Sequence, residues 1–182
     1  MASLNGVTIK NLKQFMSHEG PMWQGNIYLG NKKIGFWSND SHGGPDEFFM
    51  ESKYSGLKLM KEFARLKPEC EYIPEEIFME DLLELILREK EYKKMVKRGF
   101  EAVLFISDSY HYYQIGLTME EKHLSDQEVY ERKKKTVTEI KKKLQKESDK
   151  KKHELKIFRR LDDFVIGEPI KLSDILIDTP RN

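Results

Sequence analysis

Hydrophobic and polar residues alternate over much of the first 51 residues, a pattern typical of β-strands. The segment from Val7 to Phe15 alternates loosely and carries β-branched residues. Residues 26–29 and 34–37 flank the turn Gly30-Asn31-Lys32-Lys33, in which Gly30-Asn31 tolerates the positive φ of a tight hairpin. A further short strand is expected at Asp46–Glu51. These segments predict an antiparallel sheet.

The pattern then changes to the spacing of a helix. Apolar residues from Leu57 to Ala64 recur every three or four positions and predict a helix from Ser55 to Lys67, which Pro68 ends. A longer helix is expected to follow Pro74, because acids occupy its first turn and Gly99 is a typical end signal. Two more strands are expected at Phe100–Ile106 and Tyr110–Leu117.

The last predicted helix has a clear start and a thin apolar seam. Ser125 and Glu128 form the capping box S-D-Q-E. Its seam consists of Val137, Ile140 and Leu144. So narrow a seam lets the helix pack by one edge only, or pair with a second copy of the chain, which leaves a homodimer open.

Together these patterns predict an α+β fold: an antiparallel sheet packed on two helices, with a long charged C-terminal helix. Three segments are expected. Residues 1–123 form an α+β core domain, residues 124–160 form the long basic helix, and residues 161–182 form a tail that packs back on the core.

Composition narrows the cellular setting. The 182 residues carry a net charge of +1, with 38% hydrophobic and 35% charged residues. Cys70 is the single cysteine, so an intramolecular disulfide is excluded, which fits a reducing compartment. Residues 1–10 lack the apolar stretch of a secretory signal, and no run reaches the roughly 18 apolar residues of a membrane span. A cytoplasmic location is therefore expected.

The small net charge hides two segregated regions. Residues 69–91 hold nine acids and two bases, whereas residues 132–160 hold fourteen bases and four acids. Either region can be an ordinary solvated helix face. The basic density of the second also suits phosphate contact without base readout, or an acidic protein groove. The residues expected to bind nucleic acid or a partner are Lys133, Lys134, Lys135, Lys141, Lys142, Lys143, Lys150, Lys151, Lys152, Arg159 and Arg160.

Catalytic patterns are incomplete. The polar loop SNDSHGGP, with His18, Asp40 and His42, has donor types that suit a divalent metal and phosphodiester hydrolysis, but no fixed ligand spacing. The favoured explanation of the loop is a glycine-rich turn whose Asn, Asp and Ser side chains bond to their own backbone. No metal and no cofactor are therefore predicted.

Three smaller features have ordinary structural readings. Ser107, Asp108 and His111 lie in one hairpin, which places them poorly for a triad. Cys70 stands between acids and lacks the positive setting that activates a thiolate. The tyrosines 110, 112 and 113 can stack on bases or simply line the two faces of a strand.

One stretch carries a family resemblance. Residues 7–66 resemble a group of small proteins encoded by phages and mobile elements of bacteria. Their shared pattern is a strand, H-E-G, a hairpin and an N/D-x-x-G-G loop, at positions His18, Glu19, Gly20, Asn39, Asp40, Gly43 and Gly44 of this chain. Some members of the group look like type II-A anti-CRISPR proteins, inhibitors of the RNA-guided DNA nuclease. The resemblance assigns no role to any single residue.

The resemblance implies a stoichiometric inhibitor that binds the type II RNA-guided nuclease in the bacterial host and blocks target DNA binding or cleavage, with direct DNA or RNA contact left open. Two alternatives remain. One is a metal-dependent nuclease or other hydrolase that uses the region of His18, Asp40 and His42. The other is a nucleic-acid-binding accessory protein without catalysis.

Overall fold

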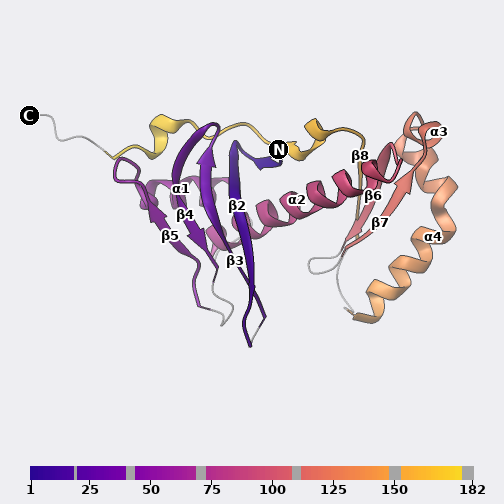
Figure 1. The fold of residues 1–182 in the computed structure, drawn as a ribbon, viewed down its shortest axis with the longest axis horizontal. Helices are drawn as coiled ribbons and strands as arrows, with labels where there is room; N and C mark the ends of the chain where they lie inside the picture. Colours follow the sequence, from indigo (N-terminus) through magenta and orange to yellow (C-terminus); the bar gives the residue numbers. More distant parts are fainter. Residues whose placement is uncertain (19, 40–43, 69–72, 108–111, 148–152, 178–182) are drawn as a thin grey trace, which may run out of the picture. The chain divides into compact units, whose positions relative to one another are not determined.

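The computed structural model describes residues 1–18, 20–39, 44–68, 73–107, 112–147 and 153–177. The chain folds into two compact units. The first combines Met1–Leu87 with Phe164–Asn182, and the second is Arg88–Asp163. The sequence predicted boundaries after residues 123 and 160 instead. Figure 1 shows the helices and strands of both units.

A six-stranded sheet forms the framework of the first unit, within its described residues. Its strands are β1 (Ser3–Leu4), β2 (Val7–Met16), β3 (Pro21–Leu29), β4 (Lys32–Ser38), β5 (Glu47–Met50) and β9 (Val165–Ile166). Their order is β5-β4-β3-β2-β1-β9, antiparallel except for the pair β1 and β9. Gly30 has a φ of +59° at the turn from β3 to β4, as expected for the predicted hairpin.

The two faces of this sheet differ, because side chains alternate along each strand. The pairing register places Ile9, Ile27 and Trp37 on one face, where all three are buried. The neighbouring positions Lys10, Asn26 and their partners point to the opposite face, where Thr8 is the only buried side chain among the described residues. One face of the sheet is therefore core and the other is open.

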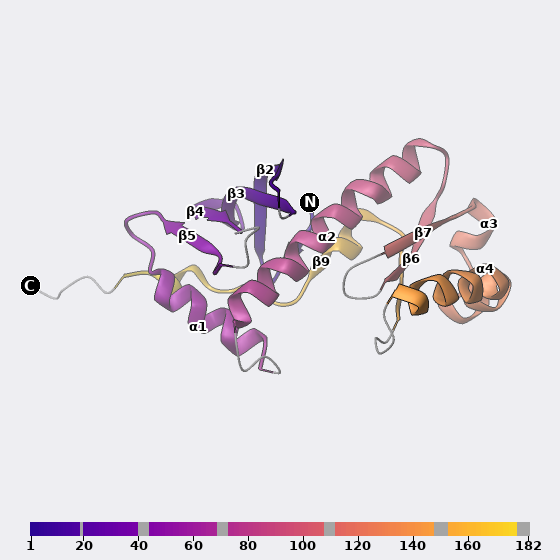
Figure 2. The ribbon, with the colours of Figure 1, turned by 90° about the horizontal axis from the view of Figure 1, so that it is seen from below.

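Two helices cover the core face. α1 spans Gly56–Leu66, and the Ser55 hydroxyl caps its start by accepting a hydrogen bond from the N–H three residues later. α2 spans Pro74–Lys97 and begins in this unit. The rings of Phe63 and Phe78 join the two helices, stacked 4.0 Å apart and fully buried. Figure 2 shows α1 and the start of α2 on the same side of the sheet.

The second unit contains a three-stranded antiparallel sheet in the order β7-β6-β8. Its strands and helices are β6 (Ala102–Ser107), β7 (Tyr112–Leu117), β8 (Glu154–Phe158), α3 (Met119–Lys122) and α4 (Asp126–Glu147). α4 packs its seam on one face of this sheet, where Val137 and Leu144 join Leu104 and Ile106 in a buried cluster. Packing of α4 by a single face agrees with its thin seam.

The segment after β8 joins the two units in the chain. It contains two short 3₁₀ helices, Leu161–Phe164 and Leu172–Ile175. Ile175 is buried, and Leu176 forms an isolated antiparallel bridge with Tyr54. Residues 164–177 thus belong to the first unit.

The predicted fold class is confirmed, since antiparallel sheet packs against helices. The expectation of a helix up to residue 160 is wrong for residues 154–158, which form β8. The physical reason is alternation: Leu155 and Ile157 both pack on the α4 cluster, and they pair with Ile106 and Leu104 of β6. A helix would place these two residues on different sides.

Candidate nucleic-acid interface

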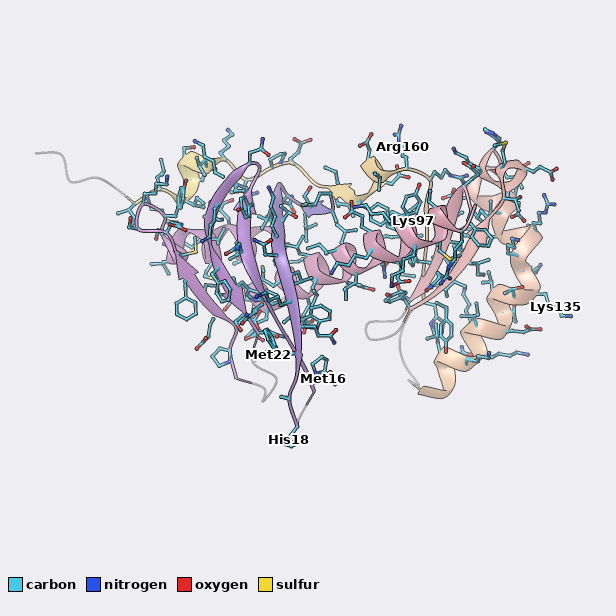
Figure 3. The ribbon with its side chains drawn as sticks, in the orientation of Figure 1. Met16, His18, Met22, Lys97, Lys135 and Arg160 are labelled. Atoms are coloured by element: carbon cyan, nitrogen blue, oxygen red, sulfur yellow. The ribbon has the colours of Figure 1, made fainter. Side chains whose placement is uncertain are left out.

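Several lysines of α4 are exposed, away from the buried seam. Lys135 and Lys142 are seven residues apart, which is about two helical turns or roughly 10 Å along one side of the helix. Both are exposed, and so is the neighbouring Lys143. In Figure 3 the labelled side chain of Lys135 points away from the three-stranded sheet. We call these three lysines the α4 lysine face.

The α4 lysine face is not neutralised by ion pairs. Glu139 lies four residues from both Lys135 and Lys143, a spacing at which pairs form readily on helices. Among the residues that the structure describes, no ion pair joins Glu139 or any other acid to Lys135, Lys142 or Lys143. Three ammonium groups on one exposed helix side therefore remain available to external anions.

Lys133 has a different role, because it is tied to the framework. Its ammonium lies 2.7 Å from the carboxylate of Glu121, and the side chain of Arg132 approaches the same carboxylate at 3.4 Å. Glu121 also accepts a hydrogen bond from the backbone N–H of Thr118, in the capping box that starts α3. Burial opposes ionisation of Glu121, but the bonds from Lys133 and Thr118 outweigh it and lower the pKa of this carboxyl.

Three more of the expected contact residues have internal partners. Lys134 pairs with Glu131 at 3.4 Å on the exposed side of α4. Arg159 binds Asp126 at 2.7 Å and also donates to the carbonyl of Lys122. Arg160 pairs with an acid three residues later at 3.2 Å. These cations are partly satisfied within the chain and are less available to phosphate than the α4 lysine face.

The remaining expected residues divide into two groups. Lys141 is half-buried beside the seam, so its side chain is only partly accessible. Lys150, Lys151 and Lys152 lie outside the described residues. The structure thus brings Lys135, Lys142 and Lys143 together on one exposed side, and places Lys133 and Arg159 in the packing of the second unit.

The polar loop of the first unit uses its described side chains structurally. Asn39 accepts a hydrogen bond from the backbone N–H of Trp23, and Asp46 accepts one from the indole of Trp37 at 2.6 Å. His18 is exposed near the tip of the hairpin between β2 and β3 (Figure 3). Asp40 and His42 lie outside the described residues. No group of three metal-binding side chains occurs in the described ranges.

Asp46 has an unusual environment. The pKa of its carboxyl is raised to about 6 as the net result of several effects. Burial is the largest and raises the pKa, the indole hydrogen bond partly offsets it, and the nearby charges of Glu76 and Glu80 add to the increase. These acids come from the start of α2. The bond to Trp37 explains why an acid stands here, since it satisfies the indole N–H of a ring that is 1% exposed.

The serine and tyrosine patterns have structural roles. Ser107 is buried and accepts a hydrogen bond from Arg88 at 2.5 Å, whereas Asp108 and His111 lie outside the described residues. Tyr113 packs on the α4 cluster. Tyr112 faces the other way, with its ring 5.9 Å from that of Phe105. Neither tyrosine stands free on an exposed face; Tyr110 and Cys70 also lie outside the described part.

Glu121 was not predicted as an important residue. The signal was present, because Thr118 to Glu121 reads T-M-E-E, a capping box of the same type as the one at Ser125. What the pattern could not indicate is that the carboxylate would also bind Lys133. That contact requires α3 to lie beside the first turns of α4.

Comparison with known proteins adds no relative. No protein-family model, no curated protein and no solved structure matches this chain. Each helix in the described ranges is too short or too polar to cross a bilayer.

Proposed function

We propose that the chain is a non-catalytic binding protein that holds nucleic-acid phosphate through the α4 lysine face. One observation carries the proposal: Lys135, Lys142 and Lys143 are exposed on one side of a packed helix, with no ion pair among the described residues. Such cations replace counterions at phosphates, so they add affinity without selecting a base sequence. The apolar side of α4 packs in the core of the second unit.

The resemblance of residues 7–66 supports a specific setting for this binding. In that setting the chain inhibits the type II RNA-guided DNA nuclease in the cytoplasm of a bacterial host. The nuclease exposes guide RNA and the DNA that it engages along a charged channel. A protein that binds both the complex and its phosphates in stoichiometric amounts would block target DNA binding or cleavage. Inhibition by an acidic surface that imitates DNA alone is less favoured than phosphate binding, because the chain is not acidic overall.

The test is a titration of the full chain against guide-loaded nuclease, read as fluorescence anisotropy of labelled target DNA. We expect loss of DNA binding to saturate at a stoichiometric ratio, also when a chelator is present at this binding step. The variant K135Q/K142Q/K143Q should need a higher concentration than wild type to reduce target DNA binding by the same amount. The matched control K61Q/K90Q/K171Q removes three exposed lysines elsewhere and should behave as wild type.

Two outcomes would contradict the proposal. Degradation of guide RNA or DNA by substoichiometric protein would favour a hydrolase built on the region of His18, Asp40 and His42. Binding of free nucleic acid without any effect on the nuclease would favour an accessory protein, and would reject the inhibitor while keeping the role of the α4 lysine face.

A further inference from the structure

The open face of the six-stranded sheet carries a row of side chains that spans four strands. The pairing register aligns Lys10 of β2 with Asn26 of β3, and Asn26 with Phe36 of β4. Phe36 in turn pairs with Phe49 of β5. Adjacent strands are about 4.8 Å apart, so the four side chains form one continuous line across the sheet.

The two phenylalanines form an aromatic pair on the open face. Their ring centroids are 6.2 Å apart with the rings tilted by 47°. Phe49 is 59% exposed and Phe36 is half-buried. An aromatic ring of this size usually occupies a core, where it stabilises the fold most. Its exposure at this position is unexplained by the packing of the first unit.

A second row lies beside the first and adds polar groups. Lys13 pairs with Gln24, and Gln24 pairs with Ser38. Lys13 therefore stands on the same side as Lys10, at the β2 end of both rows. The ammonium of Lys10 also lies 4.1 Å from the ring centroid of Tyr28 on the same face. The β2 side of this face is thus cationic, and its β4–β5 side is aromatic.

A β-bulge opens a hollow between the two rows. The register shifts between Lys10 and Lys13, and Asn11 has a positive φ of 55° within the shift. The hollow has a volume of about 470 Å³. Its lining residues are Asn11, Leu12, Lys13, Gln24, Gly25, Asn26 and Phe36. It therefore brings a cation, three side-chain amides and one aromatic ring to a single concave site.

This face is uncovered in the described part of the first unit. The ring of Phe48 points to the other face, where it lies 6.4 Å from Phe63 of α1. α1 and the start of α2 lie on that other side (Figure 2). The described chain thus shields one face of the sheet and leaves the row of Lys10, Asn26 and the two phenylalanines accessible.

We infer that this face is a binding platform for single-stranded nucleic acid. We call it the platform face and define it by Lys10, Lys13, Gln24, Asn26, Phe36 and Phe49. Exposed rings stack on unpaired bases of any sequence, and lysines beside them neutralise the phosphates. Side-chain amides carry both donors and acceptors for base edges. A duplex keeps its bases stacked on each other, so it cannot use the rings.

The chemistry of the face favours this occupant over two others. An extended protein segment would add to a sheet edge through backbone hydrogen bonds and would not need exposed rings on the face. An uncharged sugar would stack on the rings, but it carries no charge for Lys10 and Lys13 to neutralise. Glu47, at the far end of the second row, is the one acid paired into either row, and it lies at the opposite edge from the lysines.

The inference does not rest on the α4 lysine face, which belongs to the other unit. The test uses the full chain and fluorescein-labelled oligonucleotides: single-stranded dT and U oligomers, and a DNA duplex of equal length. Anisotropy titrations compare wild type with F49A, K13Q and the α4 variant K135Q/K142Q/K143Q. Matched controls are L57A and K61Q, which alter an exposed apolar residue and an exposed lysine on α1.

We expect F49A to weaken single-strand binding by about tenfold, the effect of losing one base–ring stack of about 1.4 kcal/mol, and to leave duplex binding unchanged. K13Q should lower the salt dependence of single-strand binding by about one phosphate contact. The α4 variant should bind both single strands and duplex more weakly than wild type. F49W should restore single-strand affinity, because an indole also stacks.

Three results would overturn the platform. They are equal single-strand affinities of F49A, L57A and wild type, an equal loss of duplex binding in F49A, and no single-strand binding by the α4 variant above its binding of duplex. If F49A loses affinity for dT oligomers but not for U oligomers, the platform is assigned to DNA. The reverse result would assign it to RNA. If the α4 variant binds single strands and duplex as tightly as wild type while F49A does not, the proposed role of the α4 lysine face is rejected. The platform is then unaffected.

Discussion

The ammonium of Lys133 lies 2.7 Å from the carboxylate of Glu121, a side chain of α3 in a residue that is only 4% exposed. This pair fastens the first turns of α4 to α3 and to the capping box at Thr118. One lysine of the first basic triplet is thus part of the framework, while Lys135 two positions later is free to meet a partner.

The first prediction concerns this pair. E121Q should lower the free energy of unfolding at pH 7 by about 2 kcal/mol, because it leaves the half-buried Lys133 without its charge partner. The measurement is urea denaturation followed by circular dichroism. E131Q, which breaks the exposed pair with Lys134, should cost less than about 0.5 kcal/mol. Equal costs would show that burial adds nothing to the Glu121 pair.

The same pair predicts a pH dependence. The pKa of Glu121 is lower in the folded chain than its ordinary value of 4.5. The stabilisation from ionised Glu121 is therefore fully present above about pH 4.5, and it is lost as the pH falls through the lower pKa of the folded state. The difference between wild type and E121Q should shrink in acid. A difference that stays constant down to pH 2 would contradict the ion pair as its source.

The second prediction concerns the α4 lysine face. K135Q/K142Q/K143Q should fold normally, because Val137 and Leu144 remain in the core. Binding to DNA should lose up to about three units of salt slope, about one for each phosphate contact. The measurement is anisotropy over a salt series, with K61Q/K90Q/K171Q as a control of equal charge change. Discrimination between DNA sequences should not change, and equal slopes for all three proteins would reject the interface.

The third prediction concerns Asp46, whose folded pKa is about 6 compared with an ordinary value of 3.8. Between these values the folded chain holds a proton that the unfolded chain has released, so this group lowers stability as pH rises from about 4 to 6. D46N keeps an acceptor for the Trp37 indole and cannot ionise. It should exceed wild type in stability by an amount on the order of 1 kcal/mol at pH 7, after solvent screening, and match it near pH 4. Urea denaturation across this range is the measurement, and a pH-independent difference would exclude the ionisation of Asp46 as the cause.

The fourth prediction concerns Gly25 in β3, beside the bulge. A Cβ at this position would overlap the Ile9 side chain and lie 3.1 Å from the carbonyl oxygen of Lys10. G25A should therefore destabilise the first unit by about 1–3 kcal/mol through overpacking. G30A meets no atom within 4 Å and carries only the strain of its φ of +59°, so its cost should be nearer 1 kcal/mol. Thermal denaturation compares the two, and a G25A protein as stable as wild type would show that Ile9 can move aside.

Several elements were predictable from short stretches of sequence. The capping box at Ser125 and the helix end at Gly99, with its φ of +92°, both form as expected. The apolar seam of α4 also packs as predicted. These features depend on residues within a few positions of each other, so the local pattern contains nearly all of the physics that decides them.

The candidate sites were only partly predictable. The lysine triplets identified α4 as the basic element. Lys133 and Lys135 stand in the same triplet, so the local sequence does not show that one is paired and the other exposed. Phe36 and Phe49 also look like ordinary strand residues until the register of β4 and β5 sets them side by side on the open face. Alternation shows that such residues share a face of their strand, but it does not show which face the helices cover.

The sequence by itself determined where helices begin, where turns form, and that a basic segment would be helical near residues 126–147. Only the tertiary structure decided that residues 154–158 form a strand beside β6, that Glu121 neutralises Lys133, and that Phe49 remains exposed beside the half-buried Phe36. The physical reason is the range of the interactions. Caps and turns are settled by neighbours along the chain, whereas strand pairing, ion pairs and exposure depend on which distant segments come together, and that choice is made by the burial of the whole core.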